Sequence, residues 1–363
     1  MSEQTRNEPR PGAVDAPPAD ESGRVEQAAA RTGRPPSRLA QALASPFARN
    51  ASLAVVLVVI CVIGMATTGW VGDGARFATK PNVLAILRYG ATVGVVSIGM
   101  TFVIIGGGID LSVGAIVALS SVWATTLATQ AYGPTGMVFT ALVVATAIGL
   151  VNGLLVAYGR IVPFIVTLAM LAAARGLAEL ISDKQTQRVT EPGALGFTDF
   201  FGGDVLGLPM IVLLFVVVAA VGWVVLNRTT FGRRTFAVGG NAEAARLAGI
   251  NVQRHTMLLY ALLGLCCGIA AIMITARTTA GSSTHGTYYE LEAIAAVVIG
   301  GTLLSGGRGT MVGTVIGVLI FATLSNVFTL NNLDVSRQAV AKGVIIVVAV
   351  LFQQRLARST GAT

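Results

Sequence analysis

The side chains that most often carry out enzymatic chemistry are few in this sequence and lie far apart. It has two histidines, His255 and His285, and three cysteines, Cys61, Cys266 and Cys267, which all lie in apolar stretches. A zinc site or a histidine-dependent catalytic triad needs several such side chains together, and the cysteines have no disulfide or metal spacing. We therefore predict no catalytic residue and no metal site, and we interpret the cysteines as small core residues.

One stretch imitates part of a nucleotide-handling site. Residues 304–308 read Leu-Ser-Gly-Gly-Arg, which looks like the signature loop of ABC ATPases. Such a loop works only opposite a phosphate-binding loop, and the pattern G-x-x-x-x-G-K-[ST] occurs nowhere in the sequence. We interpret 304–308 as a turn between apolar segments. The chain is predicted to hold no cofactor and not to hydrolyse ATP itself.

The composition is typical of a membrane protein. Hydrophobic residues make up 54% of the chain and charged residues 12%, against roughly 45–50% and 25% in soluble domains. The 43 glycines fit this class, because glycine lets membrane helices approach closely. Most Lys and Arg lie in the N-terminal tail and in loops, so the net charge of +8 indicates orientation in a membrane and contact with anionic lipid rather than nucleic-acid binding.

The sequence predicts an all-α polytopic bundle of about ten transmembrane helices. Residues 1–48 are too polar to form a core and predict a disordered N-terminal tail, 49–355 form the transmembrane domain, and 356–363 form a C-terminal tail. Most of the apolar segments approach the roughly 20 residues needed to span a bilayer. They are 51–68, 83–105, 111–130, 135–158, 162–181, 208–227, 256–276, 290–304, 310–330 and 338–353. The short segment 290–304, which ends in two glycines, favours a tilted, broken or partly re-entrant helix.

The positions of Lys and Arg predict that both termini are cytoplasmic. With the tail inside, ten spans return the C-terminus to the same side. That side then carries the seven arginines of residues 1–49 together with Arg160, Arg228, Arg233, Arg234, Arg246, Arg254, Arg308, Arg355 and Arg358. The outer side carries Arg76, Lys80, Lys184, Arg188 and the acidic residues of the loop 182–207.

Ionisable residues in membrane segments are informative because a charge at the bilayer centre costs at least about 2.5–3.5 kcal/mol. Those of this chain lie near the predicted segment ends, so we predict no proton or ion relay. They are Arg175, Glu179, Glu290, Glu292 and Lys342.

Neutral polar side chains occur in several segments and have two interpretations. They are Ser97, Thr101, Asn152, Thr167, Thr275, Ser325 and Asn326. Hydrogen bonds between helices, worth about 0.6 kcal/mol each on average, explain most of them. The alternative is that some line a path for a polyhydroxy solute, for which we select Asn152, Thr167 and Asn326.

A glycine-rich motif between the second and third segments also has two interpretations. Its residues are Gly106, Gly107, Gly108, Asp110, Ser112 and Gly114. The glycines end one helix, and Asp110 or Ser112 can cap the next, which gives a tight structural turn. Glycine joints also absorb backbone changes, which would suit a gate. The stretch around Gly106 resembles the one around Gly300, 194 residues later, which indicates either an internal repeat or merely two similar glycine- and valine-rich helices.

A polar interruption at 230–252 separates two strongly apolar runs. Its second half predicts a short helix with Asn241 as N-cap, Glu243 in the first turn and Gly249 as the C-terminal stop. A short helix held between two membrane helices on the positive side is typical of a docking element for a cytoplasmic partner. The alternative is a positively charged loop that only fixes topology.

Several groups of residues occur together and in a fixed order along residues 50–355. They are Gly107 to Gly114, Asn152-Gly153, Pro163 to Leu168 with Arg175-Gly176, and Gly239 to Asn241 followed by Ala244 to Ile250. Together they resemble the ribose/xylose/arabinose-type permease subunits of bacterial ABC importers. The motifs are specific for that family but not for one sugar. The long N-terminal tail departs from the shorter termini of the family.

The resemblance implies a type II ABC importer-like permease over 49–355, acting as a homodimer in the bacterial inner membrane. It also implies a separate ATPase subunit with two nucleotide-binding cassettes, which binds ATP and Mg, and an extracytoplasmic sugar-binding protein. The short helix is then the coupling helix, with Asn241, Glu243, Ala244, Ala245, Arg246, Leu247 and Gly249 meeting the ATPase. The cargo would be a monosaccharide or related polyol. An ion-coupled secondary transporter is the alternative, and it would need the relay that the segments lack.

Overall fold

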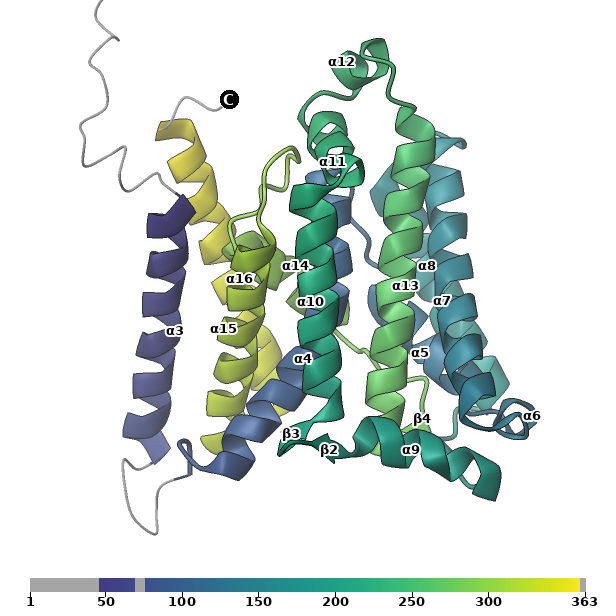
Figure 1. Cartoon of the computed structure of the whole chain (residues 1–363). Coiled ribbons are helices and arrows are strands. Elements are labelled where there is room, and N and C mark those ends of the chain that lie inside the picture. The colour runs from purple at the N-terminus through teal and green to yellow at the C-terminus, as the bar shows by residue number, and fades with distance from the viewer. Residues whose placement is uncertain (1–45, 69–75, 360–363) are drawn as a thin grey trace, which may run out of the picture. The chain divides into compact units, whose positions relative to one another are not determined.

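The computed structural model describes residues 46–68 and 76–359. The chain divides into two units, Met1–Ala48 and Arg49–Thr363. The second unit is an all-α polytopic bundle, as predicted (Figure 1). The predicted N-terminal tail lies outside the described residues except for 46–48, which begin the first helix, α3. The last four residues of the predicted C-terminal tail also lie outside them.

Seven of the described helices are long and apolar enough to cross a membrane. They are α3 (Pro46–Thr68), α4 (Lys80–Ile105), α7 (Gly133–Ala157), α8 (Pro163–Ser182), α10 (Met210–Arg228), α13 (Val252–Thr278) and α15 (Met311–Leu330). Large apolar side chains such as Val216 and Val217 on α10 point out of the bundle, as expected of a surface that meets lipid. α16 (Val335–Ser359) contains the last predicted segment, 338–353, but is not one of these seven helices.

Two predicted segments contain only short helices, which corrects the continuous segment expected at 111–130. α5 (Val113–Ala124) has 12 residues and α14 (Tyr289–Ile299) has 11. At 1.5 Å per residue they extend about 18 and 16 Å, roughly half of a 30 Å hydrocarbon core. The expected continuous segment 111–130 breaks after α5 at Thr125, and Thr126 caps the separate short helix α6 (Leu127–Gln130). The short helix expected at 290–304 is confirmed, and a tilted, broken or partly re-entrant arrangement stays a prediction.

The remaining elements lie at the two ends of the bundle (Figure 1). At one end, called the α9 end, are β1 (Gln187–Arg188), η1 (Pro192–Ala194), α9 (Leu195–Gly202), β2 (Asp204–Val205), β3 (Leu208–Pro209) and β4 (Ala280–Gly281). β1 pairs antiparallel with β4, and β2 with β3. At the other end, called the α12 end, are α11 (Thr230–Gly240) and α12 (Ala242–Leu247).

α4 is the central helix of the main core. Its side chains are buried almost without interruption from Gly90 to Ile105, and it packs against α10, α13, α14 and α15. A helix that is apolar on all sides and buried on all sides is expected at the centre of a membrane bundle. The turn that follows α4 therefore starts from the buried core and lies toward the α12 end of the bundle.

Candidate functional site

The predicted docking helix forms as α12, and both of its ends are capped by its own sequence. The Asn241 side-chain oxygen accepts a hydrogen bond from the Ala244 amide at 2.9 Å. At the other end Gly249 has φ of +83°, and the Ile250 amide donates to the Ala245 carbonyl at 3.0 Å. These are a side-chain N-cap and a left-handed glycine stop. The predicted cap and stop are both confirmed.

α12 lies at the far tip of its end of the bundle (Figure 1). Its exposed side chains are both apolar and charged. Leu247 is 76% exposed, whereas Ala245 is buried against the rest of the fold. Arg246 forms an ion pair with Glu243 at 2.6 Å. The hydrogen bonds from Arg246 lower the pKa of the Glu243 carboxyl, so the pair is ionised at neutral pH. An exposed leucine beside a fixed ion pair is a surface that suits a protein partner.

The glycine-rich motif forms the turn between α4 and α5. Gly107 has φ of +87°, and the Gly108 amide donates to the Val103 carbonyl at 2.9 Å, which closes the end of α4 in the way glycine-ended helices do. Ser112 is the N-cap residue of α5, but its side chain makes no capping bond. The tight turn is therefore present, but the predicted side-chain cap of α5 is wrong, because Asp110 bonds Ser112 and not the first turn of the helix. A role in gating stays a prediction.

Asp110 is fully buried in this turn and satisfied by its neighbours. One carboxylate oxygen accepts hydrogen bonds from the Ser112 amide at 2.7 Å and the Ser112 hydroxyl at 2.6 Å. Asn152 of α7 donates to the other oxygen at 3.3 Å and to the Ser112 hydroxyl oxygen at 2.9 Å. Burial raises the pKa of the Asp110 carboxyl, and these hydrogen bonds oppose that rise. The network ties the α4–α5 turn to α7.

Three backbone segments meet at the α12 end in what we call the glycine junction: the α4–α5 turn, the end of α11, and the turn at 304–308. The Gly307 amide donates to the Ile105 carbonyl at 2.8 Å. A Cβ on Gly239 would overlap that same carbonyl oxygen, and one on Gly306 would lie 2.9 Å from the Gly239 oxygen. The residues of α11 next to the docking helix therefore touch both turns directly.

The glycine junction borders a cavity of about 310 Å³. Gly106, Gly107 and Gly108 line it together with Gly239, Gly240 and Asn241. The structure thus brings the predicted gating motif and the start of the predicted docking helix to one cavity, although they lie more than a hundred residues apart. Val156, Pro163 and Tyr260 complete its wall from α7, α8 and α13.

The three predicted path residues are placed apart, and each has a partner within the fold. Asn152 belongs to the Asp110 network. Thr167 donates to the Pro163 carbonyl of its own helix at 3.0 Å. Asn326 exchanges two hydrogen bonds with Asn82, at 2.7 and 3.1 Å. Pairing of polar groups between helices, our interpretation for most such residues, is confirmed for Asn152 and Asn326, and contact with a solute stays a prediction.

Two charged residues near segment ends, as expected, are also buried inside the bundle. Lys342 of α16 forms an ion pair with Glu292 of α14 at 2.6 Å, and both side chains are largely buried. The Tyr89 hydroxyl of α4 donates to the same carboxylate at 2.7 Å. Glu292 lies in the first turn of α14 and Lys342 about two turns into α16, so both are near helix starts as expected, and the structure adds that they are buried and paired.

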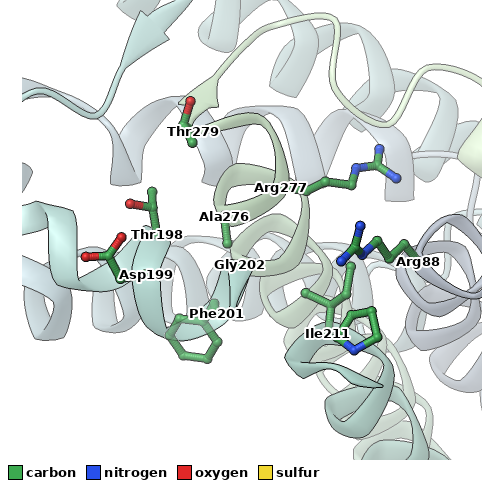
Figure 2. Close-up of a pocket in the computed structure, with 10 residues that line it drawn as sticks. Arg88, Thr198, Asp199, Phe201, Gly202, Ile211, Ala276, Arg277 and Thr279 are labelled. Atoms are coloured by element: carbon green, nitrogen blue, oxygen red, sulfur yellow. The ribbon is translucent and has the colours of Figure 1, made fainter. Parts of the chain in front are cut away.

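A second cavity, of about 330 Å³, opens at the α9 end (Figure 2). Arg88 and Arg277 lie on one side of it, and Thr198 and Asp199 of α9 lie on the other. Arg88 also pairs with Asp204 at 3.1 Å. Arginines, a carboxylate and hydroxyls around one cavity can bind hydroxylated or charged groups, because they offer both donors and acceptors.

Sequence analysis missed α11 and the glycine junction. Residues 230–240 contain Arg233, Arg234 and three glycines, and this composition predicts a polar interruption and not a helix. The turn predicted at 304–308 is confirmed, with Gly306 and Gly307 at positive φ. The sequence contains no sign that this turn lies beside Gly239, apart from the two Gly-Gly pairs 239–240 and 306–307.

The fold and this site define a multi-pass α-helical membrane protein with the short helices α5 and α14 in the bundle and the capped helix α12 at one end. The chain belongs to the family described as branched-chain amino acid transport system / permease component, whose model matches residues 82–352. No solved structure matches the chain.

Its relatives include transport permeases for three sugars. The chain is 43% identical to the ribose import permease protein RbsC of Bacillus subtilis (strain 168), over 77% of this chain and 86% of that protein. It is 37% identical to the L-arabinose ABC transporter permease protein AraH of Azospirillum brasilense, over 77% and 81%. It is 34% identical to the xylose transport system permease protein XylH of Escherichia coli (strain K12), over 83% and 91%. The predicted family resemblance is confirmed.

Proposed function

We propose that this chain is the membrane subunit of an ATP-driven importer for a pentose or a related polyol. Two copies form the path through the inner membrane, and an extracytoplasmic binding protein delivers the sugar. A separate cytoplasmic subunit with two nucleotide-binding cassettes binds ATP and Mg and hydrolyses the nucleotide. The relatives named for ribose, arabinose and xylose support this cargo class.

The observation that carries the proposal is the contact between Gly239, just before the docking helix, and Ile105 at the end of α4. α12 exposes Leu247, and the residue before its N-cap, Gly240, follows the glycine that packs on Ile105. A partner that moves α12 therefore moves a segment in direct contact with the end of α4. This is a physical route by which nucleotide binding in another subunit acts on the membrane helices.

The distribution of charge supports a cytoplasmic α12 end. Basic residues at that end include Arg160, Arg228, Arg233, Arg234, Arg246, Arg254 and Arg308. The α9 end combines basic residues with Asp183, Glu191, Asp199, Asp204 and Asp334. Loops rich in Arg and Lys remain on the cytoplasmic side. The cavity of Arg88 and Arg277 then faces outward, where the binding protein releases its sugar.

Leu247→Asp tests the coupling assignment. We expect co-purification of the ATPase subunit with the permease to fall about tenfold or more, as when an interface anchor is lost. Sugar uptake in proteoliposomes should fall with it. The matched control is Leu206→Asp, which changes a fully exposed leucine in the β2–β3 turn at the opposite end. That control should retain the ATPase subunit.

Two outcomes would count against the proposal. Full retention of the ATPase subunit by Leu247→Asp would contradict docking at α12. ATP-independent uptake by the permease without an ATPase subunit, driven by an ion gradient, would favour the secondary transporter.

A further inference from the structure

Between α13 and α14 lies a segment that is rich in hydroxyl groups, has no helix or strand, and has no role in the site described above. This polar segment comprises residues 282–288, Ser-Ser-Thr-His-Gly-Thr-Tyr. It begins directly after β4 at the α9 end and leads to the start of α14.

Contacts with α5 place the polar segment inside the bundle. Gly281 packs against the Ser121 carbonyl, and Gly286 packs against the Gly114 carbonyl. Between these two contacts α5 covers 121 − 114 = 7 residues, or about 10 Å of helix axis. The polar segment thus runs alongside α5 from its outer part to its first turn.

A second measure of depth comes from α4. Glu292, in the first turn of α14, accepts the hydrogen bond from Tyr89. Tyr89 lies 89 − 80 = 9 residues from the start of α4, which is about 13 Å along its axis. A hydrocarbon core is about 30 Å thick. Measured from Ser121 and from the start of α4, Gly286 and Glu292 thus lie about 10 and 13 Å further into the bundle.

One side of the polar segment is fixed to neighbouring helices. The Arg175 guanidinium of α8 donates to the carbonyls of Ser283 and His285, the latter at 2.9 Å. The His285 ring nitrogen Nδ1 lies 3.1 Å from the Ser121 hydroxyl of α5. Arg175 therefore supplies donors to a backbone that is not in a helix.

The other side is exposed in the single chain. Thr284, Thr287 and Tyr288 are all exposed, with Tyr288 at 49% and in the left-handed region at φ of +67°. Non-helical backbone at membrane depth is stable only where protein covers it or where it lines a water-filled cavity. Lipid is therefore excluded as the neighbour of this face.

We propose that the exposed face of the polar segment lines the path for the sugar, and that Thr284, Thr287 and Tyr288 contact the hydroxylated solute as it passes. This inference rests on the proposed function, because the second copy closes the path. Threonine and tyrosine hydroxyls both donate and accept hydrogen bonds, which matches the hydroxyl groups of a pentose. The Tyr288 ring adds an apolar surface for the sugar carbons.

Cysteine accessibility tests the location. Thr284→Cys and Thr287→Cys are assembled with the ATPase subunit and binding protein in proteoliposomes and treated with a small, charged methanethiosulfonate. The control is Val217→Cys on the outward face of α10, and the parent chain gives the background from its own three cysteines. Because the thiolate is the reactive form and apolar surroundings suppress it, we expect both path variants to react about tenfold faster than the control. Equal, slow labelling of all three would overturn the inference.

The contact itself is tested by Thr284→Val combined with Thr287→Val, which removes both hydroxyls at nearly constant volume. We expect slower ATP-dependent uptake of D-ribose, L-arabinose or D-xylose, whichever the parent transports, with unchanged basal ATP hydrolysis. Unchanged uptake kinetics would contradict the contact while leaving the importer assignment intact. Absence of ATP-dependent uptake by the parent assembly would instead contradict the proposed function.

Discussion

The amide of Gly307 donates a hydrogen bond to the carbonyl of Ile105 across a gap of 2.8 Å, and Gly239 packs against the same carbonyl. Ile105 ends α4, Gly239 lies near the end of α11, and Gly307 belongs to the turn before α15. A carbonyl at a helix end has no partner within its own helix. Here Gly307, in the turn before α15, supplies that partner, and Gly239 of α11 covers it. Displacement of α11 therefore acts on the α4–α5 turn and on the turn at 304–308.

Gly239→Ala is predicted to uncouple sugar uptake from ATP hydrolysis in an assembled importer. The added methyl group would overlap the Ile105 carbonyl and separate α11 from α4. We expect sugar uptake in proteoliposomes to fall by about tenfold, within the usual range of coupling free energies between sites, while ATP hydrolysis is retained.

The matched control lies one residue further on. Gly240→Ala adds the same methyl group, but nothing lies within 4 Å of the position it would take. It should transport normally. Equal loss of uptake in both variants would contradict the role of the Ile105 contact, because only the Gly239 substitution disturbs it.

The elements that could be predicted are those determined by local sequence. Asn241 and Gly249 act within one turn of α12, so their capping roles follow from residue type alone. By contrast, the apolar run 111–130 has the length of a full span, and it divides at Thr125, where Gly281 of β4, distant in sequence, packs against Thr125 and Ser121. The pairing of Glu292 with Lys342 joins residues 50 apart on two helices. No pattern in a single sequence records such a contact.

Asp110 is predicted to stabilise the α4–α5 turn as a hydrogen-bond acceptor. Asp110→Ala leaves the Ser112 amide and hydroxyl without this buried partner, which should lower stability by about 1–3 kcal/mol. Asp110→Asn keeps one oxygen in the same place and should cost less. The free energies are compared through denaturant unfolding in detergent micelles. An equal effect of both substitutions would mean that the charge, rather than acceptance from Ser112, is what the turn requires.

The buried ion pair gives the last prediction. Lys342→Ala leaves the Glu292 carboxylate without its cation in a site where the side chains of Lys342 and Glu292 are only 16% and 6% exposed. Removing one partner of a buried pair costs about 3–5 kcal/mol, because the remaining charge stays desolvated. We therefore expect a clearly lower Tm for the purified protein.

A matched exposed pair on the same helix separates burial from charge. Arg337 pairs with Asp334 at 3.0 Å, but their side chains are 77% and 55% exposed. Such pairs contribute about 0–1 kcal/mol, so Arg337→Ala should change the Tm little. The double variant Lys342→Met with Glu292→Gln removes both buried charges and should recover much of the loss, because no unpaired charge remains. The alternative cause of the lost stability is the packing of the Lys342 side chain of α16 against α14. A double variant as unstable as Lys342→Ala would favour that cause over the uncompensated carboxylate.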